Sequence, residues 1–282
     1  MTTAAIKDNA QLLRAQAFKA LHERPGIFAI PNPWDAGSAK MLASLGFEAL
    51  ATTSAGLAFS LGKPDGDGSV TLAETLANIQ AITAATDLPV SADLENGFGD
   101  DPAICAATIL QGAQAGLVGG SIEDATGRAD DPIYSFDLAV ARVKAAVAAA
   151  RSLPFPFTLT ARAENLIHGR PDLPDTIRRL QAFAEAGANV LYAPGLKTHE
   201  EIVTVVKAVA PHPVNVVLGL NSASFSLDEL ARLGVKRVSL GSTLARAAYG
   251  AFFRAAGEIR QKGTFHFATG TMPYSEINAL FK

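Results

Sequence analysis

The sequence lacks the features that define several large protein classes. Its 282 residues include one cysteine, Cys105, so the chain cannot form an internal disulfide framework or a thiolate metal cluster. Positive and negative side chains almost balance, with 24 Lys+Arg, 27 Asp+Glu and a net charge of −3. This balance provides no electrostatic footprint for nucleic acid or for an anionic membrane surface, and we expect neither as a partner.

Targeting segments and nucleotide-binding loops are missing as well. Residues 1–14 lack the apolar core of a signal peptide, and the alanine-rich run at 143–150 is too short to span a bilayer. We therefore expect a cytoplasmic protein. No Gly-x-Gly-x-x-Gly segment follows the first predicted strand, and no Walker-type lysine loop occurs, which argues against Rossmann and P-loop folds.

What the sequence does contain is a regular alternation of two patterns. Hydrophobic residues make up 49% of the chain and charged residues 18%, enough apolar material for one large core. Short apolar runs predict strands at 27–30, 49–53, 89–93, 118–122, 155–161, 189–193, 214–218 and 237–240. Amphipathic stretches between them predict helices at 37–45, 71–86, 102–115, 136–151, 174–186, 199–210, 227–233 and 242–261.

This alternation predicts the fold class. The strands are continuous apolar runs, as expected for a parallel sheet that is covered on both faces. Eight such units in one chain predict an α/β fold, a (β/α)8 TIM-type barrel forming a single domain at residues 1–260. The remaining residues, 261–282, form a C-terminal helical extension. Packing on a neighbouring subunit and packing on its own barrel are both open for this tail.

Acidic side chains gather where the predicted strands end. Asp65 follows the second strand, Asp93 and Glu95 the third, and Glu123 the fourth. The active site of a TIM barrel lies at this end of its strands, so the four carboxylates are expected to converge. Unpaired carboxylates in one cleft repel each other unless a cation neutralises them, and oxygen ligands without nearby Cys or His select Mg²⁺ or Mn²⁺.

A structural explanation of the same acids stays open. Each acid could cap the helix that follows it, or could form an ion pair with Arg162 or Arg128. Three other polar residues are expected to be structural. His168 and Arg170 follow the fifth strand and are interpreted as a solvated loop pair. Asn215 begins the seventh strand, at the end of the barrel away from the chemistry.

Five segments carry a specific resemblance, which extends over about residues 18–251. They are Asn32-Pro33-Trp34-Asp35-Ala36, Ser60-Leu61-Gly62-Lys63-Pro64-Asp65, Val90 to Gly99 (VSADLENGFG), Ile122-Glu123-Asp124 and Thr160-Ala161-Arg162. An acid-x-acid-x-Gly-aromatic-Gly segment followed by Ile-Glu-Asp is a combination that coincidence does not readily produce. On these segments the chain resembles the isocitrate lyase/phosphoenolpyruvate mutase superfamily.

The resemblance assigns roles to the acids. In that superfamily the first acid of the acid-x-acid pair, here Asp93, holds Mg²⁺. The acids corresponding to Asp65, Glu95 and Glu123 act largely through water molecules bound to the metal. The resemblance also implies that Glu123 belongs to the catalytic residues.

Further residues are expected to contact the substrate by the same resemblance. Ser54, Ala55 and Gly56 occupy the turn that binds the substrate carboxylate, although Ala55 departs from the family pattern. Arg162 matches a catalytic arginine that contacts the substrate's oxygen atoms, and Trp34 matches an aromatic residue lining the pocket. A 2-oxo acid would chelate Mg²⁺, and the metal with Arg162 would stabilise enolate charge on the keto oxygen.

The chain differs from the lyases and mutases of this superfamily in the loop that handles the distal end of the substrate. Isocitrate and methylisocitrate lyases carry a Lys-Lys-Cys-Gly-His loop after the fourth strand, whereas residues 123–132 here contain neither Cys nor His. The asparagine and lysines of the phosphonopyruvate-forming mutases are missing from this loop too. Cys105 is expected on a helix as a small apolar filler. The general acid/base is therefore not identified by the sequence.

These observations lead to one hypothesis with two alternatives. The hypothesis is a Mg²⁺-dependent lyase that cleaves a C–C bond, by retro-aldol cleavage or decarboxylation, of a small 2-oxo or 2-hydroxy di- or tricarboxylic acid through a metal-bound enolpyruvate. The alternatives are a phosphonomutase or C–P hydrolase acting on phosphonopyruvate-type or carboxyphosphonoenolpyruvate-type substrates, and a binding protein without activity. The resemblance also implies a homo-oligomer, a dimer or tetramer.

Overall fold

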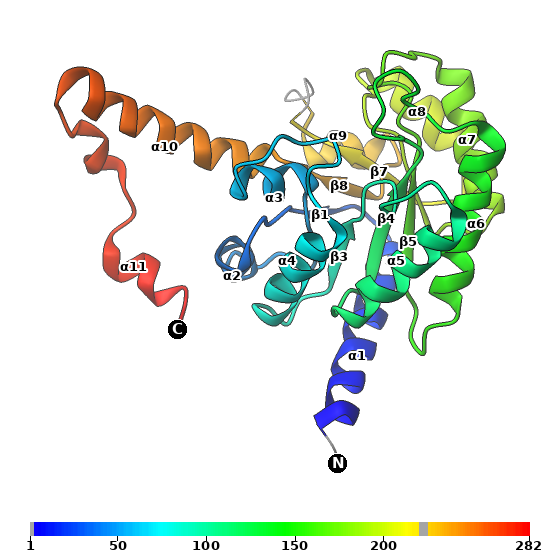
Figure 1. Ribbon diagram of the computed structural model, residues 1–282, viewed down its shortest axis with the longest axis horizontal. Coiled ribbons are helices and arrows are strands. Elements are labelled where there is room, and N and C mark those ends of the chain that lie inside the picture. The colour runs from blue at the N-terminus through cyan, green and yellow to red at the C-terminus, as the bar shows by residue number, and fades with distance from the viewer. Residues whose placement is uncertain (1–2, 220–224) are drawn as a thin grey trace.

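Eight parallel strands form the centre of the molecule. The computed structural model describes residues 3–219 and 225–282, so residues 1–2 and 220–224 of the predicted 1–260 barrel lie outside the described part. The strands follow the order β1-β8-β7-β6-β5-β4-β3-β2 and curve into a barrel (Figure 1). The strands are β1 Phe28–Ile30, β2 Leu50–Ala51, β3 Val90–Asp93, β4 Gly119–Glu123, β5 Thr158–Arg162, β6 Val190–Tyr192, β7 Val214–Val217 and β8 Arg237–Ser239.

The barrel closes between its first two strands. The backbone N–H of Ala51 donates to the carbonyl of Pro31 at 3.1 Å, and the side-chain amide of Asn32 donates to the carbonyl of Thr52. With all eight strands parallel and joined by helices, the (β/α)8 fold is confirmed. The predicted strand ends agree with the structure to within a few residues.

Strand register brings the polar residues to one level. β4 and β5 are paired over five residue pairs, and the last pair places Glu123 beside Arg162. Asp93, the last residue of β3, is paired with Ser121 of β4. The carboxyl ends of neighbouring strands therefore present these charged groups together.

Most of the helices surround the barrel, and the last two extend away from it (Figure 1). The helices are α1 Thr3–Glu23, α2 Ala36–Ser44, α3 Ser54–Ser60, α4 Leu72–Ala84, α5 Pro102–Gln114, α6 Phe136–Arg151, α7 Leu173–Glu185, α8 His199–Ala208, α9 Leu227–Arg232, α10 Thr243–Lys262 and α11 Tyr274–Ala279, with a 3₁₀ turn at His266–Gly270. Capping boxes begin α4, α8 and α9, at Thr71, Thr198 and Ser226. Such boxes satisfy N–H groups that the helix itself leaves unpaired, so these starts are encoded locally.

Two of the helices are absent from the sequence prediction. α3 forms where a substrate-binding turn was expected. α1 presents a narrow apolar stripe, in which Ala15, Phe18 and Leu21 are buried, and so carries a weak periodic signal. Its Phe18 ring packs against Gly119, where an added Cβ would lie 2.7 Å from the ring. α1 thereby covers the amino-terminal end of the barrel (Figure 1).

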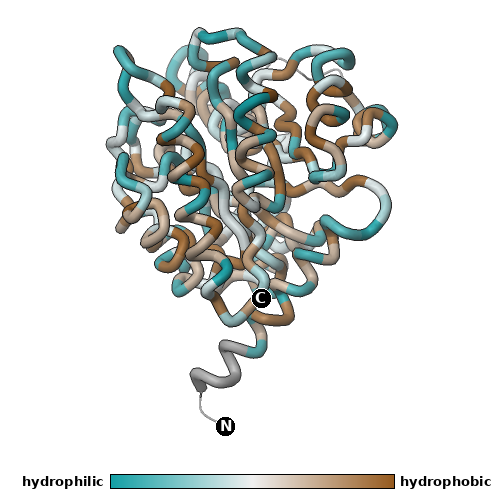
Figure 2. The backbone as a smooth tube through the Cα atoms, turned by 90° about the vertical axis from the view of Figure 1, so that its right-hand side faces the viewer, coloured by the Kyte–Doolittle hydropathy of each residue, from teal (hydrophilic) through white to brown (hydrophobic). Residues whose placement is uncertain are grey.

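The other end of the barrel is open and polar. The loops there, away from the N-terminus, are mainly hydrophilic (Figure 2). The largest apolar cluster lies between the strands and the surrounding helices and includes Ile79, Leu117, Phe183 and Val216. Within the described ranges, no helix combines the length and the apolar character that crossing a bilayer requires.

The C-terminal residues leave the barrel. α10 projects away from it, and the predicted division at residue 260 falls inside this helix (Figure 1). Ala245 is the buried residue of α10, whereas Phe252 is 70% and Phe253 78% exposed. The chain then turns back, and Lys40 of α2 donates to the carbonyl of Phe281 at 3.3 Å. The segment from Thr243 to the C-terminus thus forms an arm with exposed aromatic side chains.

Candidate active site

Two connected cavities lie at the carboxyl ends of the strands. The outer cavity, about 730 Å³, is lined by the loops that follow β2, β3, β4 and β5. The inner cavity, about 310 Å³, lies along the barrel axis and is lined by residues from all eight strands or their ends. Both are lined by Ser54, Asp65 and Arg162, so these residues lie where the two cavities meet.

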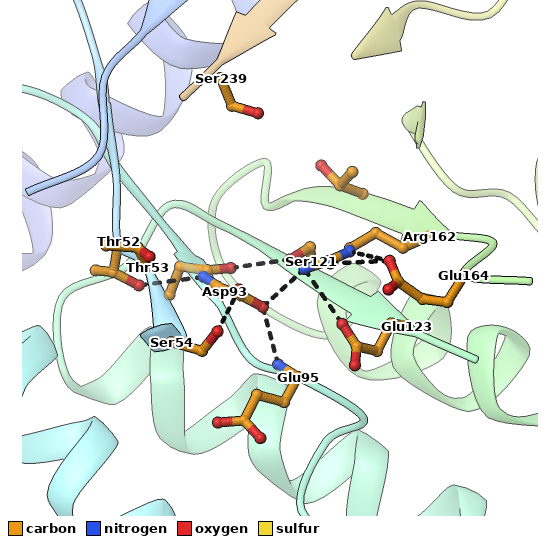
Figure 3. A network of polar contacts seen from close by, with 12 residues as sticks. Thr52, Thr53, Ser54, Asp93, Glu95, Ser121, Glu123, Arg162, Glu164 and Ser239 are labelled. Atoms are coloured by element: carbon orange, nitrogen blue, oxygen red, sulfur yellow. Dashed lines mark hydrogen bonds and ion pairs between the residues drawn. The ribbon is translucent and has the colours of Figure 1, made fainter. Parts of the chain in front are cut away.

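Arg162 is the centre of the charged groups (Figure 3). Its Nη1 lies 3.1 Å from Oδ1 of Asp93 and 3.2 Å from Oε2 of Glu123, and its Nη2 lies 2.8 Å from Oε1 of Glu164. The guanidinium also lies over the ring of Tyr192, 4.9 Å from its centroid. The side chain of Arg162 is only 13% exposed. Three carboxylates therefore share one cation that is largely shielded from solvent.

Asp93 is held in place by hydrogen bonds from three elements. The Ser54 hydroxyl donates to Oδ2 of Asp93 at 3.0 Å, and the backbone N–H of Glu95 donates to Oδ1 at 3.1 Å. The N–H of Asp93 donates to Oγ1 of Thr52 at 3.1 Å. The carboxylate is therefore oriented before any ligand arrives, which reduces the cost of binding one.

The loop after β3 adopts a strained backbone conformation. Glu95 and Phe98 have φ angles of 48° and 62°, in the left-handed region that costs non-glycine residues free energy. The buried Arg142 of α6 holds this loop by donating to the carbonyls of Asn96, Gly99 and Asp100. This bracing fixes the direction in which the Glu95 side chain points.

The carboxylates are short of positive charge. Burial, followed by the neighbouring Asp93 and Asp65 charges, raises the pKa of Glu95 to about 7. Burial and Asp93 also raise the pKa of Asp65. The pKa of Glu123 lies well above its ordinary value, mainly because the group is buried, although Arg162 opposes the shift. One arginine does not compensate all these acids, so the site favours a further cation.

The donor set fits a magnesium ion. All the candidate donors are hard carboxylate oxygens, and Mg²⁺ commonly keeps several waters while binding one or two carboxylates. Among the described residues, no three His, Cys, Asp or Glu side chains converge closely enough to hold an ion directly. The chemistry of Asp93, Asp65, Glu95 and Glu123 is therefore compatible with a magnesium ion that keeps much of its water shell.

Most of the residues expected to bind ligands lie at these cavities. Glu95 and Glu123 line the outer cavity, Asp93 and Ala55 the inner one, and Ser54, Asp65 and Arg162 both. Trp34 and Gly56 line neither. Gly56 is buried in α3, where an added Cβ would lie 2.9 Å from Cβ of Trp34, and its N–H donates to Oγ1 of Thr53.

Two residues gain importance that the sequence did not indicate. Glu164 is buried and bonded to Arg162, and His168 lines the outer cavity with Nε2 3.6 Å from Oε2 of Glu164. His168 is thus 35% exposed at the cavity wall, beside Glu164, and it is not paired with Arg170. The spacing Arg162-x-Glu164 on an extended segment could have indicated the pair, since alternate residues share a face.

Asp124 of the Ile-Glu-Asp segment has a structural role. Its carboxylate accepts hydrogen bonds from the N–H of Glu164 at 2.8 Å and from Nη1 of Arg179 at 3.0 Å. Burial raises its pKa to about 6. Asp124 thereby ties the ends of β4 and β5 to α7 and keeps Glu123 and Glu164 in position.

A barrel with ionisable groups gathered at the carboxyl ends of its strands has the architecture of a TIM-barrel enzyme. Residues 18–260 match the family described as phosphoenolpyruvate phosphomutase. The chain therefore belongs to this family, within the isocitrate lyase/phosphoenolpyruvate mutase superfamily, whose members include lyases, mutases and hydrolases.

Three relatives illustrate the range of that superfamily. A putative lyase/mutase from Burkholderia cenocepacia J2315 is 61% identical, with a TM-score of 0.94 over 97% of both chains. A probable 2-methylisocitrate lyase from Corynebacterium glutamicum is 30% identical over 89% of this chain and 83% of its own. Phosphonopyruvate hydrolase in complex with oxalate and Mg²⁺ is 26% identical, with a TM-score of 0.85 over 95% of this chain and 94% of its own.

Proposed function

We propose that the protein is a Mg²⁺-dependent lyase that breaks a C–C bond of a small 2-oxo or 2-hydroxy acid, by decarboxylation or retro-aldol cleavage. The observation that carries the proposal is the position of Arg162, buried among Asp93, Glu123 and Glu164 where the two cavities meet. Similarity to a 2-methylisocitrate lyase and to a Mg²⁺-containing hydrolase of an oxo acid supports it. The cytoplasm remains the proposed location.

The chemistry requires a place for negative charge. When the bond from C3 of a 2-oxo acid to the departing group breaks, its electron pair moves to the keto oxygen as an enolate. Arg162 would donate hydrogen bonds to that oxygen, and such preorganised donors are among the largest contributions to catalysis. Glu164 and Glu123 hold the guanidinium in place. The N–H groups and hydroxyl at Ser54 and Ala55 would orient the substrate carboxylate.

Asp93 would hold the magnesium ion, with Asp65, Glu95 and Glu123 acting through its waters. When bound, the ion supplies Lewis acidity at the substrate's oxygen atoms. Mn²⁺ prefers similar ligands and is an expected substitute. The protein's own contribution is to orient these donors and to place Arg162 beside them.

Pyruvate release tests the proposal. Oxaloacetate, 2-methylisocitrate, substituted malates and phosphonopyruvate would be incubated with the protein, with Mg²⁺ and with EDTA. Isocitrate would be tested in the same way, with glyoxylate as the product measured, because its cleavage gives glyoxylate and succinate. Metal-dependent release from a carboxylic acid supports the C–C lyase. Release from phosphonopyruvate alone would instead support C–P hydrolysis, the alternative suggested by the hydrolase relative and by Arg128 at the outer cavity. Binding of Mg²⁺ and pyruvate without turnover of any compound would favour a binding protein.

Magnesium affinity is expected to depend on pH. The pKa of Glu95, raised to about 7, means that this acid is partly protonated in the metal-free protein near pH 7, and the pKa values of Asp65 and Glu123 are raised as well. Mg²⁺ prefers the ionised acids, so binding releases protons and the affinity rises with pH. If one proton is released, Kd falls about tenfold per pH unit below pH 7. Calorimetry in buffers of different ionisation enthalpy measures this release, and an equal Kd at pH 6 and pH 8 would contradict it.

His168 is expected to supply the proton that the enolate carbon takes up. It lines the outer cavity beside the buried Glu164, and histidine is a frequent proton donor in catalysis. His168→Asn should lower kcat about 10²- to 10⁴-fold, with KM and Mg²⁺ affinity nearly unchanged. Arg170→Gln, on the same loop but outside both cavities, is the matched control. Equal kcat values for the two variants would exclude this role.

The exposed arm supports a homo-oligomer, which is part of the proposal. Phe252, Phe253, Phe265 and Tyr274 are all more than 60% exposed on the segment from Thr243 to the C-terminus. Exposed aromatic groups in this number mark a protein interface. We infer that the arm packs on a second copy of the chain, giving a dimer or tetramer. Sedimentation as a monomer at micromolar concentration would contradict this.

A further inference from the structure

Arg237 is a buried cation at the bottom of the inner cavity. It is the first residue of β8, is 6% exposed, and lines the cavity together with Asn215 and Ser239. The sequence placed Asn215 at the end of the barrel away from the chemistry. The structure places it inside the barrel, bonded to Arg237, so its amide is part of the cavity wall.

The hydrogen-bond partners of Arg237 are all neutral. Its Nε donates to Oδ1 of Asn215 at 2.8 Å, its Nη2 donates to Oγ1 of Thr160 at 3.0 Å, and its Nη1 lies 3.4 Å from Nε2 of His22. The His22 Nδ1 lies 2.8 Å from the carbonyl of Phe18, and burial lowers the pKa of His22 to about 3, so the ring is neutral. With Nδ1 donating, Nε2 is the acceptor for Arg237.

Other arginines with buried side chains are compensated differently. Arg162 and Arg179 contact carboxylates, and Arg142 donates to three carbonyls and covers the ring of Tyr134. Arg237 forms no ion pair with any residue that the structure describes, although burial lowers its pKa only to about 10 and leaves it charged at neutral pH. A guanidinium has five N–H donors, of which these neutral partners take three. Burying a charge without a counter-ion is costly.

The position of Arg237 suggests which group could serve as its counter-ion. Thr160, its hydrogen-bond partner, precedes Arg162 by two residues on β5, so the two side chains lie on the same face of the strand about 6.6 Å apart along it. The inner cavity connects these two levels, and Ser91, Ser121 and Ser239 give it polar walls. Its volume of about 310 Å³ is at the lower end of the range for small-molecule sites.

We propose that Arg237 binds a second carboxylate of the substrate, which extends from the Asp93–Arg162 level down the barrel axis into the inner cavity. This inference rests on the proposed function, since it assumes that the 2-oxo acid group lies at Asp93 and Arg162. It identifies the substrate as a dicarboxylate and names the residue that selects it. The neutral partners of Arg237 hold its guanidinium in position but do not neutralise its positive charge, so a ligand carboxylate can do so.

Calorimetric binding in the presence of Mg²⁺ tests the inference without turnover. The probes are pyruvate, 2-oxoglutarate, 2-oxoadipate, and the methyl esters of the last two at their distal carboxylate. In the wild type, at least one dicarboxylate should bind about 10- to 100-fold more tightly than its ester, as expected for a charge-assisted hydrogen bond. This comparison needs no variant, so it holds even where a substitution impairs folding.

Three variants assign the effect to a residue. Arg237→Gln should abolish the preference for the charged group while pyruvate affinity stays the same. His22→Gln loosens the contact with α1 outside the cavity, and it should lower thermal stability but keep the preference. Arg128→Gln removes the arginine of the outer cavity, the competing site for a distal anion, and it should also keep the preference.

The outcomes separate the two proposals. If pyruvate does not bind to the wild type in a Mg²⁺-dependent way, the proposed function fails, and the inference fails with it. If pyruvate binds but the esters bind as tightly as the acids, the inference alone is overturned. Loss of the preference in Arg128→Gln instead of Arg237→Gln also overturns it. Loss in His22→Gln to the same extent as in Arg237→Gln would mean that Arg237 only anchors α1.

Discussion

Replacing Asp93 with asparagine should abolish Mg²⁺ binding and lower pyruvate release at least about 10³-fold. Asp93 is the acid on which the loops after β2 and β3 converge, through the Ser54 hydroxyl and the Glu95 N–H. Asparagine keeps the shape and one oxygen but removes the charge that holds the ion. A metal Lewis acid contributes several kcal/mol to the transition state, and each 1.4 kcal/mol is about a tenfold change in rate.

The controls for this prediction use calorimetry as well as kinetics. Asp87→Asn makes the same chemical change at an exposed acid that forms an ion pair with Arg14, and it should bind Mg²⁺ like the wild type. Circular dichroism of Asp93→Asn should show an intact fold. Unchanged Mg²⁺ affinity in Asp93→Asn would refute the assignment of the metal site, whatever happened to the rate.

Arg162→Lys is expected to lower kcat/KM about 10²- to 10³-fold while Mg²⁺ still binds. Lysine keeps the charge but loses the planar group that reaches Glu164, Asp93 and Glu123 simultaneously. A donor aimed at a developing oxyanion contributes roughly this factor in other enzymes. Steady-state kinetics on the compound that releases pyruvate measures it.

Arg162→Gln separates stability from catalysis. It leaves the buried Glu164 without its cation, so unfolding should become easier by about 3–5 kcal/mol. Arg179→Lys disturbs a comparable buried ion pair, with Asp124, outside both cavities. It should lower thermal stability but reduce kcat/KM much less than Arg162→Lys does. Equal losses in both lysine variants would show that Arg162 acts only through the fold.

The barrel could be predicted from the sequence because its signals are local. Apolar runs such as Val214–Val217 are fully buried strands, and capping residues such as Thr198 begin helices at the expected points. α1 escaped prediction because its buried stripe is narrow and its partners lie far away in the sequence. α3 was not predicted because residues 54–56 were interpreted as a substrate-binding turn, whereas Thr53 caps a helix that begins there.

The acids of the site could be placed from the sequence, but their partners could not. The expectation that carboxylates follow successive strands needs only strand order, whereas the contact between Arg162 and Glu164 depends on side-chain direction. Arg237 is the first residue of a predicted strand, and nothing in the sequence indicates that its side chain points into the barrel. Which face of β8 carries a charge depends on the registers of β5 and β7, and these are set by the whole barrel.

The helix at the amino-terminal end of the barrel has a consequence for synthesis on the ribosome. α1 precedes β8 along the chain, yet the two are joined by the contact of Nη1 of Arg237 with Nε2 of His22, 215 positions earlier. At about 5–20 residues per second, translation leaves an interval of roughly 10–40 s between the two. During that interval His22 lacks its guanidinium partner, although the apolar residues that cluster with Phe18 and Leu21 have already been made. The attachment of α1 to the barrel is therefore completed only after β8 has been made.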